Sequence, residues 1–180
     1  MNKINIKEIV ENLVDTFLYA GKVSLELRKN GLTKEIKPDN TPVSNGDLEV
    51  NKIITKKILN LTPNIPIISE ETSDNKSLKD LNNFWLIDPI DGTYDYINNL
   101  DEFTINAGLI IDKQPAAGLI YAPAKKRMFY SYGNDLAFEL LDGKPIKLNF
   151  TNEFNKDEIK FVSYSNKIKP EIEKIHKKLN

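Results

Sequence analysis

The sequence predicts an α+β fold in which two long amphipathic helices pack on a large, mainly antiparallel sheet. Two observations support this prediction. Apolar residues recur at helical spacing over the first third of the chain, and short runs rich in Ile, Val, Phe and Tyr follow it, separated by turn residues. Helices first and a meander of strands afterwards is typical of helices stacked on one antiparallel sheet.

The two helices are predicted at residues 6–29 and 48–61. In both, apolar residues stand three and four positions apart and form one stripe. Gly31 follows a basic end of the first helix and is a plausible stop. Ser44 with Asp47 three positions later is typical of the capping pattern that opens a helix, so it marks the start of the second one.

Consecutive strands are expected to pair as antiparallel hairpins. The loops between them are short, and a parallel crossover needs a dozen or more residues. A further strand at 159–163 and a helix at 170–179 are expected in the tail. The strands before the tail are predicted at 65–69, 84–88, 103–112, 116–122, 128–132 and 136–140.

Composition restricts the chemistry. Lys and Arg number 25 against 26 Asp and Glu, which argues against a nucleic-acid polymer as partner. The chain has no Cys and one His, which excludes thiolate chemistry and multi-histidine metal sites. No signal-peptide core and no stretch of about 18 uncharged apolar residues is present, so we expect a cytoplasmic protein without membrane association.

Acidic residues gather at three places, and two of these places end an apolar strand. Asp47 closes the loop KPDNTPVSNGD, Glu70 and Glu71 follow one strand, and Asp88 and Asp91 follow another. Strands that end in acids suggest carboxylates converging at one sheet edge, where mutual repulsion calls for a cation. Oxygen ligands without His or Cys select Mg²⁺, Mn²⁺ or Ca²⁺. The spacing of these acidic residues excludes both a haloacid-dehalogenase motif and an EF-hand loop.

The stretch Asp-Pro-Ile-Asp-Gly-Thr at 88–93, with Glu70-Glu71 and Asp47 before it, resembles the inositol monophosphatase superfamily. That resemblance implies a sugar-phosphatase-like fold and a Mg²⁺-dependent, lithium-sensitive phosphomonoesterase. The segments DEFTINAGLI (101–110) and PAAGLIYAP (115–123) are most similar to the 3'(2'),5'-bisphosphate nucleotidase branch.

The resemblance also implies a role for each matching residue. It makes Asp47 and Thr93 the pair that positions and deprotonates the attacking water, and counts Glu70 with them as catalytic. The backbone amides of Gly92 and Thr93 are expected to hold the substrate phosphate at a helix start. The implied ligands of two or three Mg²⁺ (or Mn²⁺) ions are Glu70, Asp88 and the carbonyl of Ile90 for the first, Asp88 and Asp91 for the second, and Glu71 near a third.

One family motif is missing from these 180 residues. Family members carry a further metal-binding Asp in a Trp-Asp-x-Ala-Ala motif, whereas Trp85 is the single Trp here. The segment FVSYSN (161–166) resembles the opening strand of the family's second domain. We therefore expect an N-terminal metal-binding domain at 1–150 and the incomplete start of a truncated α/β domain at 151–180.

The expected function is hydrolysis of a small phosphorylated metabolite, first of all 3'-phosphoadenosine 5'-phosphate. Two alternatives stay open: an inositol monophosphatase-type activity, or an inactive member that binds metal without turnover. The isolated chain is expected to bind one Mg²⁺ or Mn²⁺ with little activity, and a homo-oligomer is possible.

Overall fold

A computed structural model of the chain describes residues 5–38, 40–72, 81–149, 170–171 and 173–174. The chain divides into two compact units, Met1–Leu148 and Asn149–Asn180. The strand predicted at 159–163 and the segment 161–166 lie outside the described residues, as does most of the helix predicted at 170–179. The assignment of 151–180 to the start of a second domain therefore stays a prediction.

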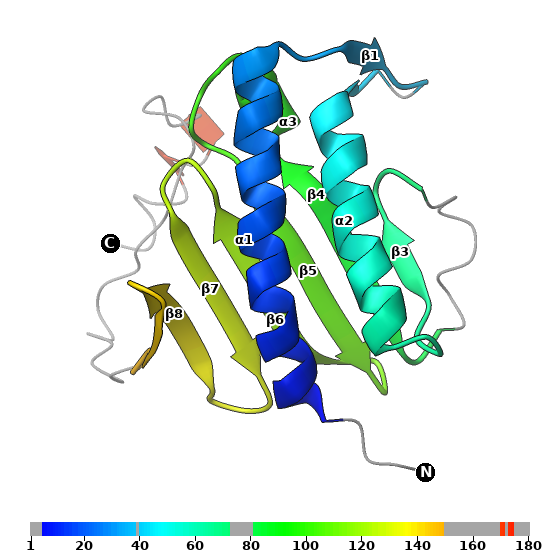
Figure 1. Cartoon of the computed structure of the whole chain (residues 1–180), viewed down its shortest axis with the longest axis vertical. Coiled ribbons are helices and arrows are strands. Elements are labelled where there is room, and N and C mark those ends of the chain that lie inside the picture. The colour runs from blue at the N-terminus through cyan, green and yellow to red at the C-terminus, as the bar shows by residue number, and fades with distance from the viewer. Residues whose placement is uncertain (1–4, 39, 73–80, 150–169, 172, 175–180) are drawn as a thin grey trace. The chain divides into compact units, whose positions relative to one another are not determined.

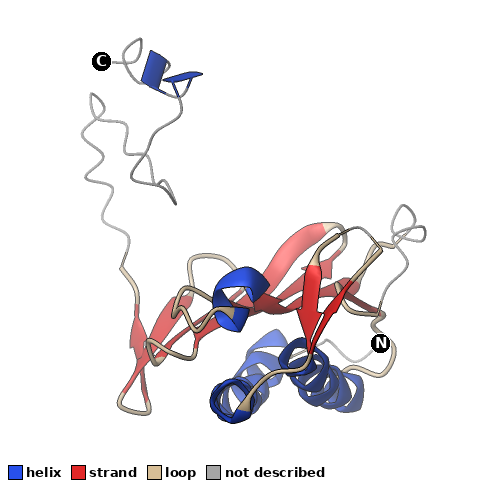
Figure 2. Cartoon of the chain, turned by 90° about the horizontal axis from the view of Figure 1, so that it is seen from above, coloured by secondary structure: helices blue, strands red, loops and turns tan. Residues whose placement is uncertain are grey.

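Both predicted long helices are present, as α1 (Ile6–Asn30) and α2 (Asn45–Leu61). They lie side by side across one face of the sheet (Figures 1 and 2). Helix α2 begins three residues before the predicted start, because Ser44 caps it: its side chain accepts from the N–H of Gly46, and Asp47 accepts in return from the N–H of Ser44. No helix in the described part of the chain is long and apolar enough to cross a membrane.

The main sheet has seven strands in the described part of the chain, in the order of the sequence. All neighbours pair antiparallel except the first two, which run parallel. This confirms the predicted α+β class with a mainly antiparallel sheet. The expectation that consecutive strands pair as antiparallel hairpins is wrong for the first pair, because the connection from Ser69 to Phe84 is long enough for a parallel crossover. The strands are β3 (Ile67–Ser69), β4 (Phe84–Asp91), β5 (Thr104–Ile111), β6 (Gln114–Ala122), β7 (Arg127–Tyr132), β8 (Ala137–Leu141) and β9 (Lys144–Lys147).

Three further features differ from the prediction. A small separate hairpin, β1 (Lys34–Ile36) and β2 (Pro42–Ser44), precedes α2, and β9 adds an edge to the sheet. Every residue of β1 and β9 is exposed, so neither strand has the alternation of apolar and polar residues by which a strand is predicted from sequence. Strand β4 also continues beyond Asp88, where the predicted strand ends, because a shift of register between Asp88 and Asp91 accommodates Pro89 within the pairing.

The core lies between the two helices and the sheet. It is built from the apolar stripes of α1 and α2 and from alternate residues of the central strands, among them Trp85, Ile105, Leu109, Leu119 and Met128, each almost fully buried. Burying a large apolar side chain contributes about 1.5–3 kcal/mol. This packing fixes the N-terminal end of α2 at the same end of the fold as the end of β4 and the short helix α3 (Thr93–Ile97) (Figure 1).

Candidate active site

The predicted site residues come from three segments that meet at one edge of the sheet. Asp47 lies in the first turn of α2, and Asp88 and Asp91 lie in the last half of β4. Because β3 runs parallel to β4, both strands end at this edge. The N–H of Glu70 donates to the carbonyl of Ile87 at 3.1 Å, which brings Glu70 alongside Asp88.

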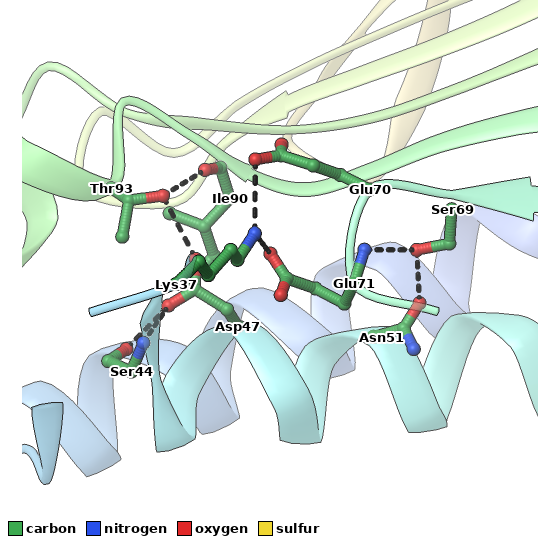
Figure 3. A network of polar contacts seen from close by, with 9 residues as sticks. All are labelled: Lys37, Ser44, Asp47, Asn51, Ser69, Glu70, Glu71, Ile90 and Thr93. Atoms are coloured by element: carbon green, nitrogen blue, oxygen red, sulfur yellow. Dashed lines mark hydrogen bonds and ion pairs between the residues drawn. The ribbon is translucent and has the colours of Figure 1, made fainter. Parts of the chain in front are cut away.

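Asp47 is held by its own helix cap and is 1% exposed. Its Oδ2 accepts hydrogen bonds from the N–H and the hydroxyl of Ser44, at 2.8 and 2.6 Å. Its Oδ1 lies 3.0 Å from the hydroxyl of Thr93, which is also 2.9 Å from the carbonyl oxygen of Ile90 (Figure 3). The Thr93 hydroxyl has one proton for these two acceptors, so it can satisfy only one of them at a time.

Lys37 forms ion pairs with Glu70 and Glu71 that the sequence did not predict. Its Nζ lies 2.8 Å from Glu71 Oε1 and 3.2 Å from Glu70 Oε1 (Figure 3). The Lys37 side chain is 18% exposed and that of Glu71 only 3%, whereas that of Glu70 is 49% exposed. Lys37 opens the loop KPDNTPVSNGD, but a lysine in a polar loop is most often solvated, and nothing local in the sequence sets it apart.

Both members of the buried pair have raised pKa values. Burial lowers the pKa of Lys37, but the hydrogen bond and charge of Glu71, followed by those of Glu70, outweigh burial and raise it. Burial raises the pKa of Glu71, and the hydrogen bond and charge of Lys37 offset only part of that rise. The Glu71 backbone is tied to α2, because its N–H donates to Ser69 Oγ and that hydroxyl donates to Asn51 Oδ1.

Asp88 lies among like charges. Burial raises its pKa to about 7, with further contributions from the charges of Glu70 and Asp91, from the hydrogen bond that a protonated Asp88 donates to Glu70, and from Asp47. Its buried Oδ1 has no hydrogen-bond partner among the described residues. A carboxylate in this position is destabilised at neutral pH unless a cation is added.

Asn106 stands opposite Asp88 on the neighbouring strand β5. Its Nδ2 donates to Asp91 Oδ2 at 3.1 Å, while its buried Oδ1 has no partner within the described part of the chain. Together with Glu70, Asp88 and Gly108 it lines a pocket of about 330 Å³. The sequence predicts a strand at 103–112 and a family resemblance at 101–110 but no site role for Asn106, so its place beside two predicted metal ligands is an addition.

Among the described residues, no three acidic or histidine side chains are close enough to form a ready-made metal cluster. Glu70 and Glu71 turn toward Lys37, and Asp47 is engaged by Ser44 and Thr93. The donor set of carboxylates and one carbonyl nevertheless suits a hard divalent cation. Asp88 Oδ1 has no partner within the described residues and the Asp88 pKa is raised, so added positive charge at this carboxylate would be favourable.

Tyr96 connects α3 to α1 and α2, and so stabilises the elements around the site. The hydroxyl of Tyr96 on α3 donates to the carbonyl of Ser24 on α1 at 2.7 Å, and its ring lies against Gly46 in the first turn of α2. A Cβ at position 46 would overlap that ring, so only glycine allows this approach. Gly92, with φ +92°, makes the turn from β4 into α3 and places Thr93 at the helix start.

Comparison with known proteins gives consistent results. A sequence profile of the "Inositol monophosphatase family" matches residues 5–179. The 3'(2'),5'-bisphosphate nucleotidase CysQ of Aggregatibacter actinomycetemcomitans is 34% identical over 147 residues, covering 79% of this chain and 54% of the relative. The chain thus spans about half the length of this curated relative.

Two solved structures share the fold. A staphylococcal inositol monophosphatase-1 in a LiCl-soaked inhibitory complex aligns with a TM-score of 0.68 at 20% identity, covering 77% of this chain and 52% of that one. An IMPase/NADP phosphatase complexed with Mg²⁺ and phosphate aligns with a TM-score of 0.66 at 20% identity, covering 74% and 51%.

Proposed function

Since the chain belongs to the inositol monophosphatase family, we propose that it is a Mg²⁺-dependent phosphomonoesterase of small phosphorylated metabolites. The observation that supports the proposal is the position of the Thr93 hydroxyl, which lies within hydrogen-bond distance of both the buried carboxylate of Asp47 and the carbonyl of Ile90. A hydroxyl held this way, beside an edge crowded with acids, suits the activation of a water molecule.

The metal-holding residues would be carboxylates of this edge together with one backbone carbonyl. Glu70, Asp88 and the carbonyl of Ile90 would hold a first ion, Asp88 and Asp91 would hold a second, and Glu71 would lie near a third. Support comes from the raised pKa of Asp88 and its unpartnered Oδ1, which a cation would correct. Bound Mg²⁺ would supply Lewis-acid chemistry by offsetting negative charge on the phosphoryl and leaving oxygens.

The protein groups then move one proton. When Thr93 donates its proton to Asp47 Oδ1, a lone pair of its oxygen can accept a hydrogen bond from the attacking water. As the water oxygen bonds to phosphorus, its proton passes to Thr93 Oγ1 and the Thr93 proton passes to Asp47. The ester P–O bond breaks, and the departing alkoxide takes a proton from solvent. Ser44 keeps Asp47 in place, because both of its donors bind the other carboxylate oxygen.

The substrate we propose first is 3'-phosphoadenosine 5'-phosphate. The support is the CysQ relative, a 3'(2'),5'-bisphosphate nucleotidase that is 34% identical to this chain over 147 residues. The amides of Gly92 and Thr93, at the first turn of α3, are the proposed anchors of the scissile phosphate.

Phosphate release with Mg²⁺ from adenosine 3',5'-bisphosphate, inositol 1-phosphate and fructose 1,6-bisphosphate tests the proposal, with chelator and Thr93→Val as controls. We expect the nucleotide to be the preferred substrate and Thr93→Val to lower the rate at least about 100-fold, the usual contribution of a positioned proton acceptor. Turnover is expected to be slow, because these 180 residues hold no Trp-Asp-x-Ala-Ala motif. Equal rates for wild type and Thr93→Val would refute the mechanism, and no release from any ester would refute the activity.

A further inference from the structure

The carboxylate edge of this fold already holds one positive charge. Five carboxyl groups lie there, from Asp47, Glu70, Glu71, Asp88 and Asp91, and the ammonium of Lys37 sits against two of them. An ammonium within hydrogen-bond distance of two carboxylates does part of what a metal ion would do, since it offsets their mutual repulsion.

We propose that Lys37 is a built-in competitor of the divalent cation: its ammonium occupies the Glu70–Glu71 end of the site, and metal binding displaces it from Glu70. The inference rests on the proposed function, because it takes Glu70 as a metal ligand. It goes further by assigning to a loop lysine the control of metal affinity.

The competition follows from the positions of the charges. Lys37 Nζ is 3.2 Å from the Glu70 oxygen, and Glu70 lies beside Asp88. A divalent cation held by Glu70 would therefore share that carboxylate with the ammonium, and two positive charges on one partly buried carboxylate repel each other. Either the metal binds less tightly or Lys37 moves away.

Lys37 is placed where it can move. It stands at the tip of the β1–β2 hairpin, whose ladder has only three residue pairs. The turn is closed by hydrogen bonds between Lys37 and Thr41 and between Asn40 and Lys37. A ladder this short is a weak element, so shifting its tip requires little free energy. The lysine stem adds four rotatable bonds of its own.

The base of the same hairpin is anchored. The N–H of Asn45 donates to the carbonyl of Thr33 at 3.2 Å, and the N–H of Thr33 donates to Asn45 Oδ1 at 3.1 Å. Displacement of Lys37 can therefore stay confined to the tip, leaving the start of α2 and Asp47 in position.

The test is the affinity of the 180-residue chain for Mg²⁺, measured by isothermal titration, and for Mn²⁺, measured by electron paramagnetic resonance. Lys37→Gln should bind the cation about three- to tenfold more tightly than wild type, the range expected for losing a partly screened like charge. Lys37→Arg retains the charge and should stay within about twofold of wild type. Lys34→Gln, on the same hairpin and with no carboxylate contact in the described chain, is the matched control.

A second measurement uses the unmodified protein and does not depend on how a variant folds. Saturating Mg²⁺ should raise the rate at which acetic anhydride modifies Lys37, relative to Lys34, because release from Glu70 leaves the Lys37 amine more accessible to the reagent. Mass spectrometry of the labelled peptides gives the ratio. An unchanged ratio would overturn the proposal.

The outcomes separate this inference from the proposed function. If wild type binds a divalent cation and Lys37→Gln binds it equally or more weakly, Lys37 supports the site and the inference alone fails. If wild type binds no divalent cation, the proposed metal-dependent function fails and the inference fails with it. Tighter binding by Lys37→Gln together with wild-type affinity in Lys37→Arg supports both.

Discussion

Replacing Asp88 by Asn should stabilise the metal-free chain at neutral and alkaline pH and abolish its proposed metal-dependent activity. Asp88 is half-buried beside Glu70 and Asp91, and its buried Oδ1 has no hydrogen-bond partner among the described residues. The amide removes the charge while keeping the shape of the side chain. The variant therefore tests whether this carboxylate strains the fold in the absence of a cation.

The size of the effect follows from the pKa of Asp88, which burial and its acidic neighbours raise from the ordinary 3.8 to about 7. A rise of about three units corresponds to about 4 kcal/mol at about 1.4 kcal/mol per unit. Asp88 is only partly buried, so solvent screening reduces this figure, and we take about 1–2 kcal/mol as the expected gain. For a chain of this length that is a rise in melting temperature of roughly 2–8 °C.

The sign fixes the pH window. The folded-state pKa of Asp88 lies above the unfolded value, so its stabilising contribution is complete below pH 3.8 and is lost as the pH rises to about 7. Over this window the unfolded chain releases the proton while the folded chain still holds it. The difference between variant and wild type should therefore grow from pH 4 to pH 7 and then level off.

Urea denaturation with chelator at pH 5 and pH 8 measures this difference. Trp85 is the single tryptophan and is fully buried, so its fluorescence reports unfolding directly. Asp15→Asn removes the same charge from an exposed position on α1 and should change the free energy of unfolding by less than about 0.5 kcal/mol. If Asp88→Asn is no more stable than wild type at pH 8, the carboxylate is not strained and the reasoning is wrong.

Three further outcomes are expected. Millimolar Mg²⁺ should raise the melting temperature of wild type, because a ligand at 100 times its dissociation constant adds about 2.7 kcal/mol of stability. Glu70→Gln should reduce that rise, and an equal rise in both proteins would show that Glu70 is not a metal ligand. Gly46→Ala should destabilise the fold by about 1–3 kcal/mol in urea denaturation, because its Cβ overlaps the ring of Tyr96; a neutral result would mean that α2 shifts freely. Thr62→Val should lower the free energy of unfolding by about 1–3 kcal/mol, since it leaves the buried indole N–H of Trp85 without its acceptor, whereas Thr62→Ser should retain most of the stability.

The sequence was most informative where side chains alternate between core and solvent. The stripes of α1 and α2 and the runs of the central strands follow directly from burial on one face, and each was predicted within a few residues. The β1–β2 hairpin and β9 escaped prediction, because their exposed residues are set by pairing with neighbours and not by burial. The strand predicted at 84–88 stopped short of Asp91, since the bulge that accommodates Pro89 depends on pairing with β5.

The same division applies to the candidate site. That Glu70 and Asp88 share an edge could be predicted, because acids that end two apolar strands meet where those strands meet. The contact of Lys37 with Glu71 could not, since it joins residues 34 positions apart and depends on how a polar hairpin folds back. The place of Asn106 opposite Asp88 follows from the β4–β5 register, which neither strand specifies alone.

The cap on α2 has a consequence for the order in which the site assembles as the chain folds. Ser44 and Asp47 are three residues apart, so closing their contact costs little loop entropy and can accompany formation of the helix itself. Asp47 and Thr93 are 46 residues apart and meet only once β4 and α3 are docked. A partly folded chain can thus retain an ordered Asp47 while lacking its partner. The Asp47–Thr93 contact is therefore a reporter of complete folding, and protection of the neighbouring amides from hydrogen exchange should follow global unfolding, not the fraying of α2.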